Sequence, residues 1–287
     1  MKFCHRHKDI DKEIAYYGGS FTCLPLNSQL DLYDKITPFL DEKTFLRYST
    51  RPDGINDQVL SLSKSKHVRT IELGIQDFDD HVLLATQRGY TREIALQACK
   101  QVKANDIRLS IQLMPGLPGY SAERFEQTIR DTIAVVPDYV RIYPTLVIKG
   151  TPLEQMYRDG CYQPLTLESA MSDVSSIVEK LESAGITVIK VGLSGIEKSQ
   201  VVAGPFHPAF GELVRAEIYT GRIIQAYETD KVLEISVKDR SLLLGNQKEY
   251  LTRIKHKLKQ TTLKVKVTDT LHKGEFRLIS DIDFESW

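Results

Sequence analysis

The chain has 287 residues, with 38 Lys+Arg against 38 Asp+Glu, 41% hydrophobic residues and 26% charged residues. This length predicts one large domain or two ordinary ones. The charge balance excludes a globally basic nucleic-acid binder, although a local basic patch stays open. No apolar run approaches the roughly 20 residues of a membrane-spanning helix. The start (MKFCHRHK) lacks the apolar stretch of a secretory signal, so we expect a cytoplasmic protein without a membrane partner.

The cysteine pattern indicates neither a disulfide framework nor a metal site. Cys4, His5 and His7 offer metal-ligand atoms, but zinc and iron–sulfur sites take about four ligands and no second cluster lies nearby. We therefore interpret this triplet as a frayed terminus and predict no metal site. A reduced, cytosolic chain fits the absence of any CxxC pair. The four cysteines are scattered: Cys4, Cys23, Cys99 and Cys161.

Predicted strands alternate with predicted helices along the first two thirds of the chain. Apolar residues recur at helical spacing in residues 91–105 and 121–136, with Ser121 as a helix N-cap, and Gly185 follows a further helix as a C-cap. Strands separated by helices indicate parallel βα units. The predicted strands are residues 13–19, 45–51, 70–76, 108–114, 139–146 and 187–193.

One face of these strands is repeatedly polar. In residues 70–76, Ile71, Leu73 and Ile75 alternate with Glu72, Gly74 and Gln76 on the opposite face. A doubly wound sheet would be apolar on both faces, so the pattern favours an open barrel whose interior holds a polar ligand. The alternative is that some polar residues face outward in a mixed sheet. The other strands place these side chains on the polar face: Arg47, Ser49, Arg51, Ser110, Gln112, Arg141, Tyr143 and Thr145.

Glycine and proline gather where three predicted strands end, at residues 18–19, 51–54 and 114–119. In parallel βα barrels the carboxyl ends of the strands carry the functional site. Glycine lets a ligand approach the backbone closely, because it has no Cβ. The sequence therefore predicts a binding site at this edge.

Six short motifs follow one another within residues 13–211: YYGGSFT (16–22), STRPD (49–53), ELGIQ (72–76), RGYT (88–91), MPGLPG (114–119) and YPTLVIKGT (143–151). Together they resemble the radical S-adenosylmethionine (SAM) superfamily. The resemblance is strongest to the branch related to the catalytic subunit of Elongator and its bacterial relatives, since YPTLVIKGT is specific to that branch. The resemblance implies a barrel of the radical SAM type that binds SAM.

The same resemblance implies roles for backbone and loop residues. Gly18, Gly19 and Ser20 match the Gly-Gly motif, whose backbone meets the methionyl amino group of SAM. Met114 and Tyr143 match the loops on the adenine side. These five residues are predicted to bind the cofactor.

Four polar side chains are also predicted to bind SAM by resemblance. Ser49 and Arg51 lie on the strand that contacts the SAM ribose or carboxylate in related enzymes. Gln76 and Arg88 resemble the pair that holds these groups, and a guanidinium suits a carboxylate. Ordinary ion pairs are the alternative for both arginines. Glu72 is interpreted either as a structural partner of a barrel arginine or as a SAM contact.

Radical SAM enzymes hold a [4Fe–4S] cluster through three cysteines spaced CxxxCxxC, and this chain contains no such triplet. Cys4 alone cannot supply three ligands, and the other cysteines have the wrong spacing. One explanation is a truncated chain that lacks the first βα unit, which we favour. The other is a protein that has lost the cluster. In either case we expect the chain as given to be inactive in radical chemistry.

Residues 212–287 predict a small α+β domain after a turn-rich junction at 204–211. The junction contains His207, interpreted as a structural residue with catalysis as the alternative. The domain contains strands at 232–237, 263–267 and 275–279 and a basic helix at 247–258. A basic run is usually a solvated face. The alternative, supported by the tRNA substrate of the Elongator relative, is an RNA-binding surface formed by Lys255, Lys257 and Lys259.

These observations predict an α/β fold, a radical SAM-type partial barrel over residues 1–211 that lacks its first βα unit, with the small domain at 212–287. The intact enzyme would cleave SAM reductively to a 5′-deoxyadenosyl radical and modify a substrate such as tRNA. The first alternative is a non-catalytic SAM- or RNA-binding module. The second is a cluster-free barrel lyase in which a lysine such as Lys190 forms a Schiff base.

Overall fold

The computed structural model describes residues 10–280 apart from 194, 230 and 245–248. The predicted triplet Cys4, His5 and His7 therefore lies outside the described residues. The chain divides into two compact units, one that ends at Pro208 and one that begins at Ala209. The sequence-based domain boundary, between residues 211 and 212, is placed three residues later and stays a proposal.

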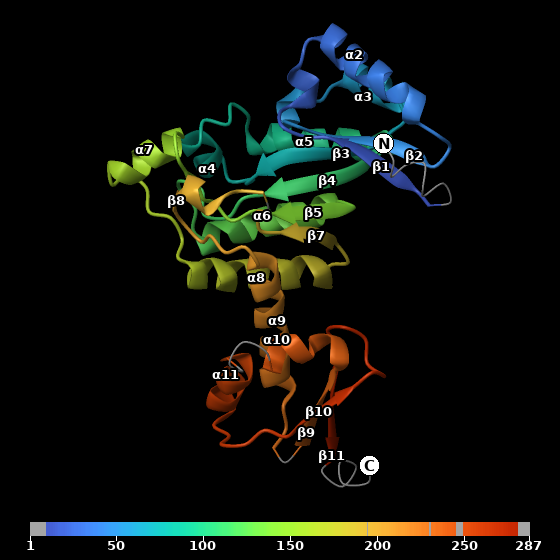
Figure 1. Cartoon of the computed structure of the whole chain (residues 1–287). Helices are drawn as coiled ribbons and strands as arrows, with labels where there is room; N and C mark the ends of the chain where they lie inside the picture. The colour runs from blue at the N-terminus through green and yellow to red at the C-terminus, as the bar shows by residue number, and fades with distance from the viewer. Residues whose placement is uncertain (1–9, 194, 230, 245–248, 281–287) are drawn as a thin grey trace. The chain divides into compact units, whose positions relative to one another are not determined.

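The first unit is built on one sheet of six parallel strands, which curls into half of a barrel (Figure 1). Its strands are ordered β1-β2-β3-β4-β5-β7, so β1 and β7 are the two edges. This architecture confirms the partial barrel that the alternating pattern predicted. The strands are β1 (Lys12–Tyr16), β2 (Thr44–Thr50), β3 (Val68–Gln76), β4 (Arg108–Leu113), β5 (Tyr139–Ile142) and β7 (Thr187–Val191).

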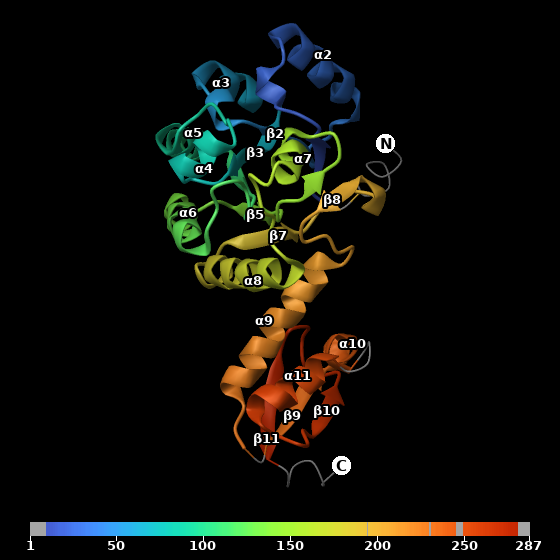
Figure 2. The ribbon, with the colours of Figure 1, turned by 90° about the vertical axis from the view of Figure 1, so that its left-hand side faces the viewer.

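Helices cover the convex face of this sheet, as the two ribbon views show (Figures 1 and 2). Ile71, Leu73 and Ile75 of β3 are fully buried on that face, because the helices remove these side chains from water. The polar residues of the same strand lie on the concave face. The helices of this unit are α2 (Leu26–Ile36), α3 (Asp57–Ser65), α4 (Asp80–Ala85), α5 (Arg92–Ala104), α6 (Ala122–Val135), α7 (Pro152–Arg158) and α8 (Leu167–Ser183).

The helix ends follow the capping residues in the sequence. Ser121 Oγ accepts a hydrogen bond from the Arg124 N–H at 3.3 Å, which satisfies one free donor in the first turn of α6. Gly185, with a left-handed φ of 78°, follows α8 and lets the chain turn toward β7. Both predicted caps are confirmed. A short antiparallel pair, β6 (Val147–Ile148) and β8 (Val201–Ala203), completes the first unit.

The second unit is an α+β module with its own apolar core. Strand β9 (Lys231–Ser236) lies between β10 (Val265–Thr268), which is parallel to it, and β11 (Phe276–Ser280), which is antiparallel. Leu233 and Ile235 of β9 belong to a buried cluster contributed also by the helices. The helices are α9 (Phe210–Ala226), α10 (Arg240–Leu244) and α11 (Glu249–Leu258).

Helix α9 is the main element that the sequence did not predict. The sequence predicted a turn-rich junction at 204–211 and no element between it and the strand at 232–237, whereas a helix of 17 residues begins at Phe210. The predicted basic helix is present as α11, and its proposed first residues, 247 and 248, lie outside the described residues. No helix among the described residues is long and apolar enough to cross a membrane.

Candidate functional site

The carboxyl ends of the parallel strands meet at one edge of the sheet, where the predicted glycine-rich loops lie. Gly18 (φ 109°) follows β1, and Gly116 (φ 90°) follows β4, so both need the left-handed backbone that favours glycine. Gln76, the last residue of β3, also has a positive φ, of 65°. This conformation is uncommon for a residue with a side chain, and it marks the edge as a candidate site.

The Gln76 amide is buried at this edge with an unused acceptor. Gln76 is 7% exposed, and its Oε1 has no hydrogen-bond partner among the described residues. A Cβ on Gly74 would lie 2.9 Å from Gln76 Nε2, so the glycine leaves the room that the amide occupies. A buried polar atom left unpaired costs about 1–3 kcal/mol. A ligand that donates a hydrogen bond to Oε1 would remove that cost.

Two arginines lie at the same edge, one of them, Arg88, next to Gly74. Arg88 donates from Nη2 to the Gly74 carbonyl and from Nε to the Tyr90 hydroxyl, both at 3.2 Å. Arg51 donates from Nε and Nη2 to the Asp53 carboxylate at 2.9 and 2.7 Å, and also to the Arg88 carbonyl. The hydrogen bond to Asp53 raises the pKa of the Arg51 guanidinium. Arg51 therefore has the ion-pair partner that the sequence left open, while Arg88 is held by neutral groups.

The other predicted residues at this edge are joined mainly through the backbone. Ser49 Oγ lies 3.5 Å from the Gly19 carbonyl, at the limit of a hydrogen bond. The Met114 N–H donates to the Gln76 carbonyl at 2.8 Å, which ties the end of β4 to that of β3. Ser20 precedes a short 3₁₀ turn and is half-buried. The structure thus gathers the predicted residues from β1 to β4 at one edge, and their contacts with SAM stay a prediction.

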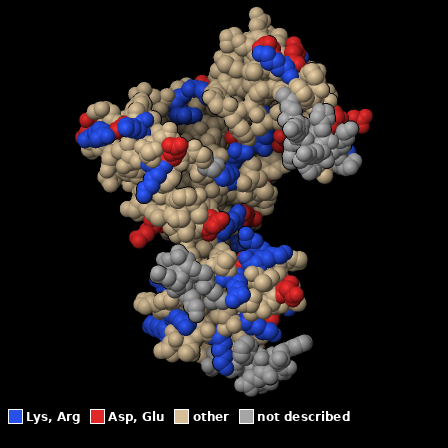
Figure 3. All heavy atoms as spheres, viewed as in Figure 1, with Lys and Arg blue, Asp and Glu red and all other residues tan. Residues whose placement is uncertain are grey.

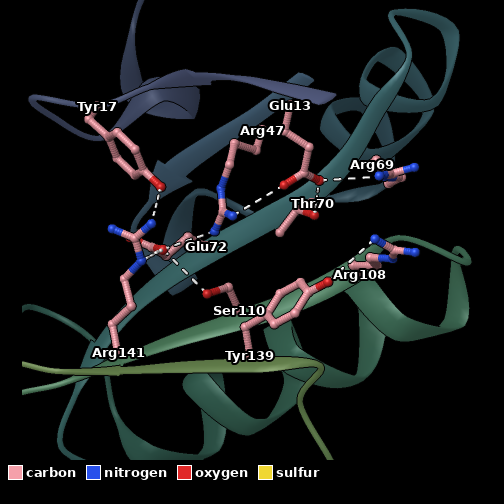
Figure 4. Close-up of polar contacts among 10 residues, drawn as sticks. All are labelled: Glu13, Tyr17, Arg47, Arg69, Thr70, Glu72, Arg108, Ser110, Tyr139 and Arg141. Atoms are coloured by element: carbon pink, nitrogen blue, oxygen red, sulfur yellow. Dashed lines mark hydrogen bonds and ion pairs between the residues drawn. The ribbon is translucent and has the colours of Figure 1, made fainter. Parts of the chain in front are cut away.

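A second polar cluster occupies the concave face, centred on Glu72 (Figure 4). The Glu72 side chain is 3% exposed, and its Oε2 lies 3.2 Å from Arg47 Nη2 and 2.9 Å from Arg141 Nε. Ser110 Oγ donates to the same oxygen at 3.3 Å. These contacts confirm the interpretation of Glu72 as a structural partner of barrel arginines.

Arg141 extends this cluster toward the carboxyl edge. Its Nη2 donates to the Tyr17 hydroxyl at 2.7 Å and its Nη1 to the Tyr143 hydroxyl at 3.2 Å, as the left side of Figure 4 shows for Tyr17. The Tyr143 hydroxyl therefore accepts a hydrogen bond from Arg141, and its contact with SAM stays a prediction. Tyr17 is 49% exposed next to Gly18, and it was not predicted as a site residue although it lies in the YYGGSFT motif.

The described residues do not provide a donor set for a [4Fe–4S] cluster. No group of three His, Cys, Asp or Glu side chains within the described ranges could hold a metal ion. Cys23 and Cys161 are exposed and far apart in sequence, while Cys99 is buried in α5. Burial raises the pKa of the Cys99 thiol to about 12, so it stays protonated and is not a thiolate ligand.

The predicted RNA surface lies on α11 and the residues that follow. Lys257 and Lys259 are exposed and Lys255 is half-buried. Other basic residues of this region are already paired, since Arg253 binds Glu217 and Lys266 lies 3.4 Å from a Glu234 oxygen. Figure 3 shows more Lys and Arg than Asp and Glu atoms on the visible face of this unit. His207 is half-buried before α9.

Two family models match the chain: the Radical SAM superfamily over residues 2–132 and the Radical_SAM C-terminal domain over residues 137–220. The fold, the glycine-rich carboxyl edge and these matches define the class, and the chain belongs to the radical SAM superfamily. Within it, the similarity is to the Elongator branch. The archaeal Methanocaldococcus infernus Elp3 with an N-terminal deletion superposes with a TM-score of 0.67 at 23% identity, covering 77% of this chain and 57% of that one.

Curated relatives support the same branch. The tRNA uridine(34) acetyltransferase of Methanocaldococcus infernus is 32% identical over 129 residues, which are 44% of this chain and 24% of that protein. Elongator complex protein 3 of Mus musculus is 31% identical over 192 residues, which are 59% of this chain and 35% of that protein. The chain thus spans between about a quarter and a third of the length of these two relatives.

Proposed function

We propose that the chain is the SAM-binding barrel of an Elongator-like radical SAM enzyme that acts on tRNA. The family and the tRNA-modifying relatives support this assignment. In the relatives' class, a bound cluster and SAM together supply radical chemistry. The described residues do not fit the cluster, so the proposal for this chain concerns the binding of SAM and of tRNA. A tRNA substrate also agrees with the predicted cytoplasmic location.

The unpartnered Oε1 of Gln76 is the observation that carries the SAM assignment. The ribose of SAM has two hydroxyl groups, and either can donate to this buried oxygen. Arg88 has neutral partners and keeps its charge for the SAM carboxylate, whereas Arg51 already pairs with Asp53. The exposed Gly18-Gly19 backbone, which has no side chains, suits the SAM ammonium group.

Titration calorimetry with SAM tests this proposal on the chain and on Gln76→Asn. Asparagine tolerates the left-handed backbone, but its side chain is one methylene shorter, so its amide oxygen no longer reaches the position of Gln76 Oε1. We expect the SAM affinity to fall about tenfold, which corresponds to roughly 1.4 kcal/mol. Gln155→Asn, on the exposed face of α7, is the matched control and should bind like the parent. Equal affinities for both variants would contradict the assignment.

A non-catalytic SAM- or RNA-binding module is the second candidate. The separate placement of Cys23, Cys99 and Cys161 favours it over a catalytic assignment for the described part of the chain. The two candidates differ in turnover under reducing, anaerobic conditions after reconstitution with iron and sulfide. Release of 5′-deoxyadenosine from SAM supports the enzyme, and binding of SAM and tRNA without this product supports the module.

A further inference from the structure

The concave face of the half-barrel carries more basic than acidic side chains. Four arginines and a lysine lie there. The lysine is Lys190 of β7, which is aligned with Arg141 of β5, and aligned residues of neighbouring strands point to the same face of a sheet. Three carboxylates face them, one of which, Asp11, has a side chain that is 56% exposed. Figure 3 shows Lys and Arg atoms gathered over the strands on this side. The basic residues are Arg47, Arg69, Arg108, Arg141 and Lys190.

The available carboxylates are already used by three of the arginines. Glu72 binds Arg47 and Arg141, as described above. Glu13 Oε2 lies 3.2 Å from Arg47 Nη1, and its Oε1 lies 3.6 Å from Arg69 Nε. Arg69 also donates to Asp11 at 2.6 Å. Among the described residues, no carboxylate therefore lies at ion-pair distance from a fourth arginine, and Asp11, which pairs with Arg69, attracts it only from farther away.

Arg108 is that fourth arginine. Among the described residues no carboxylate lies within 4 Å of it, and it donates a long hydrogen bond of 3.4 Å to the Tyr139 hydroxyl (Figure 4). Nearby, Arg47 is 8% exposed, and its Nε has no hydrogen-bond partner among the described residues. Burying positive charge and N–H donors without an acceptor is costly. An anion bound on this face would offset that cost.

We propose that this face, at Arg108 and Arg47, binds a phosphate group of the substrate. Guanidinium groups match phosphate oxygens in geometry and charge, and the Tyr139 hydroxyl provides a further donor. Arg108 is aligned with Thr70, six residues before Gln76, which corresponds to about 20 Å along the strand at roughly 3.3 Å per residue. The phosphate would thus lie well below the carboxyl edge. The inference rests on the proposed function only in treating the phosphate as part of the substrate.

The test compares thermal unfolding in inorganic phosphate and in chloride at equal ionic strength, for the parent, Arg108→Gln and Arg130→Gln. Arg130 is exposed on α6 and contacts Gln127, so it is the matched control. The general salting effect of phosphate acts on all three proteins alike. We expect the parent and Arg130→Gln to gain the same additional midpoint shift, and Arg108→Gln to lose most of it.

A second measurement separates anion binding from a structural role of Arg108. Without phosphate, Arg108→Gln should unfold at or above the parent's midpoint, because the variant removes a charge that has no ion-pair partner within 4 Å among the described residues. A lower midpoint, or a phosphate shift equal to that of Arg130→Gln, overturns the proposal. The same melts with adenosine monophosphate or a short RNA then identify the molecule that carries the phosphate. A higher unfolding midpoint with the mononucleotide indicates a small-molecule substrate, and a higher midpoint with RNA alone indicates a nucleic-acid strand.

SAM titration of Arg108→Gln keeps this inference apart from the proposed function. We expect unchanged SAM affinity, since Arg108 lies far from Gln76 along the strands. Failure of the chain to bind SAM, with the phosphate shift retained, would remove the proposed function and leave the anion site. A parent chain that binds SAM but shows no additional shift in phosphate would remove the anion site and leave the proposed function.

Discussion

The carboxyl edge and the middle of the concave face both contain arginines, but their partners differ. At the edge, Arg88 ends on a backbone carbonyl and a hydroxyl, and the neighbouring Gln76 keeps an unused oxygen. In the middle, Arg141 and the Nη2 of Arg47 end on the carboxylate of Glu72, and the Nε of Arg47 is left without a hydrogen-bond partner among the described residues. Charged groups that pair with one another stabilise the sheet, whereas a donor or acceptor atom without a hydrogen-bond partner is available to a ligand. Substitutions in the two regions should therefore affect different properties.

The largest effect is expected for Glu72→Gln, in the middle region. Removing this charge leaves Arg47 and Arg141 without a carboxylate they share, and breaking a buried pair in this way costs about 3 kcal/mol or more. Urea unfolding measures the change. The control, Glu126→Gln, removes an ion pair with Lys180 whose side chains are 40% and 42% exposed, and should cost at most about 1 kcal/mol. Equal losses would show that the Glu72 cluster does not stabilise the sheet.

An intermediate effect, on binding rather than stability, is expected for Arg88→Ala at the edge. Its loss should weaken SAM binding by about 1.5–3 kcal/mol, the usual range for hydrogen bonds to charged groups. Calorimetry gives the affinity, and a thermal melt should show little change. Arg92→Ala is a control with the opposite expected result. Arg92 pairs with the buried carboxylate of Asp131, so this substitution should lower stability and leave SAM affinity unchanged. Unchanged SAM affinity in Arg88→Ala would make this arginine a structural residue.

The smallest effect is expected in the second unit, on the binding of tRNA by the lysines of α11 and the residue after it. Replacing Lys255, Lys257 and Lys259 by alanine should reduce tRNA affinity modestly. The slope of log K against the logarithm of salt concentration should become shallower by about 0.9 for each lost phosphate contact. Fluorescence anisotropy across a salt series measures both. Lys35→Ala, in an exposed pair with Asp31, should change neither. Identical slopes for the parent and the triple variant would assign these lysines to a solvated face.

The sequence predicted the strands and their polar face well, because alternation along a strand is a local property. It also placed Arg51 and Gln76 at one edge, since parallel strands end together, whereas Arg88 was placed beside Gln76 by the family resemblance. It could not predict that Arg141 reaches Tyr17, 124 residues away in sequence, because that contact depends on the curl of the whole sheet. The positive φ of Gln76 and its unpaired oxygen were also hidden, since glutamine rarely adopts this backbone.

Helix α9 was missed for a different reason. Its start at Phe210 directly follows a segment rich in glycine and proline, which normally indicates a loop. Seven of its 17 residues are buried, among them Tyr219 and Ile223 of the second unit's core. The tertiary packing of these side chains determines the helix more than any local signal at its ends.

The strand order of the six-stranded sheet has a consequence for how the first unit forms. Each strand from β2 to β5 pairs with the strand that precedes it in this sheet, and β7 is added last at the far edge. No strand has to be inserted between two that are already paired. The chain can therefore extend the sheet in the order in which the ribosome releases it, and each step closes only the loop of one βα unit. Before β7 docks, the edge of each intermediate is a strand that the finished sheet pairs on both sides, and its unpaired backbone groups make this stage prone to association with other chains.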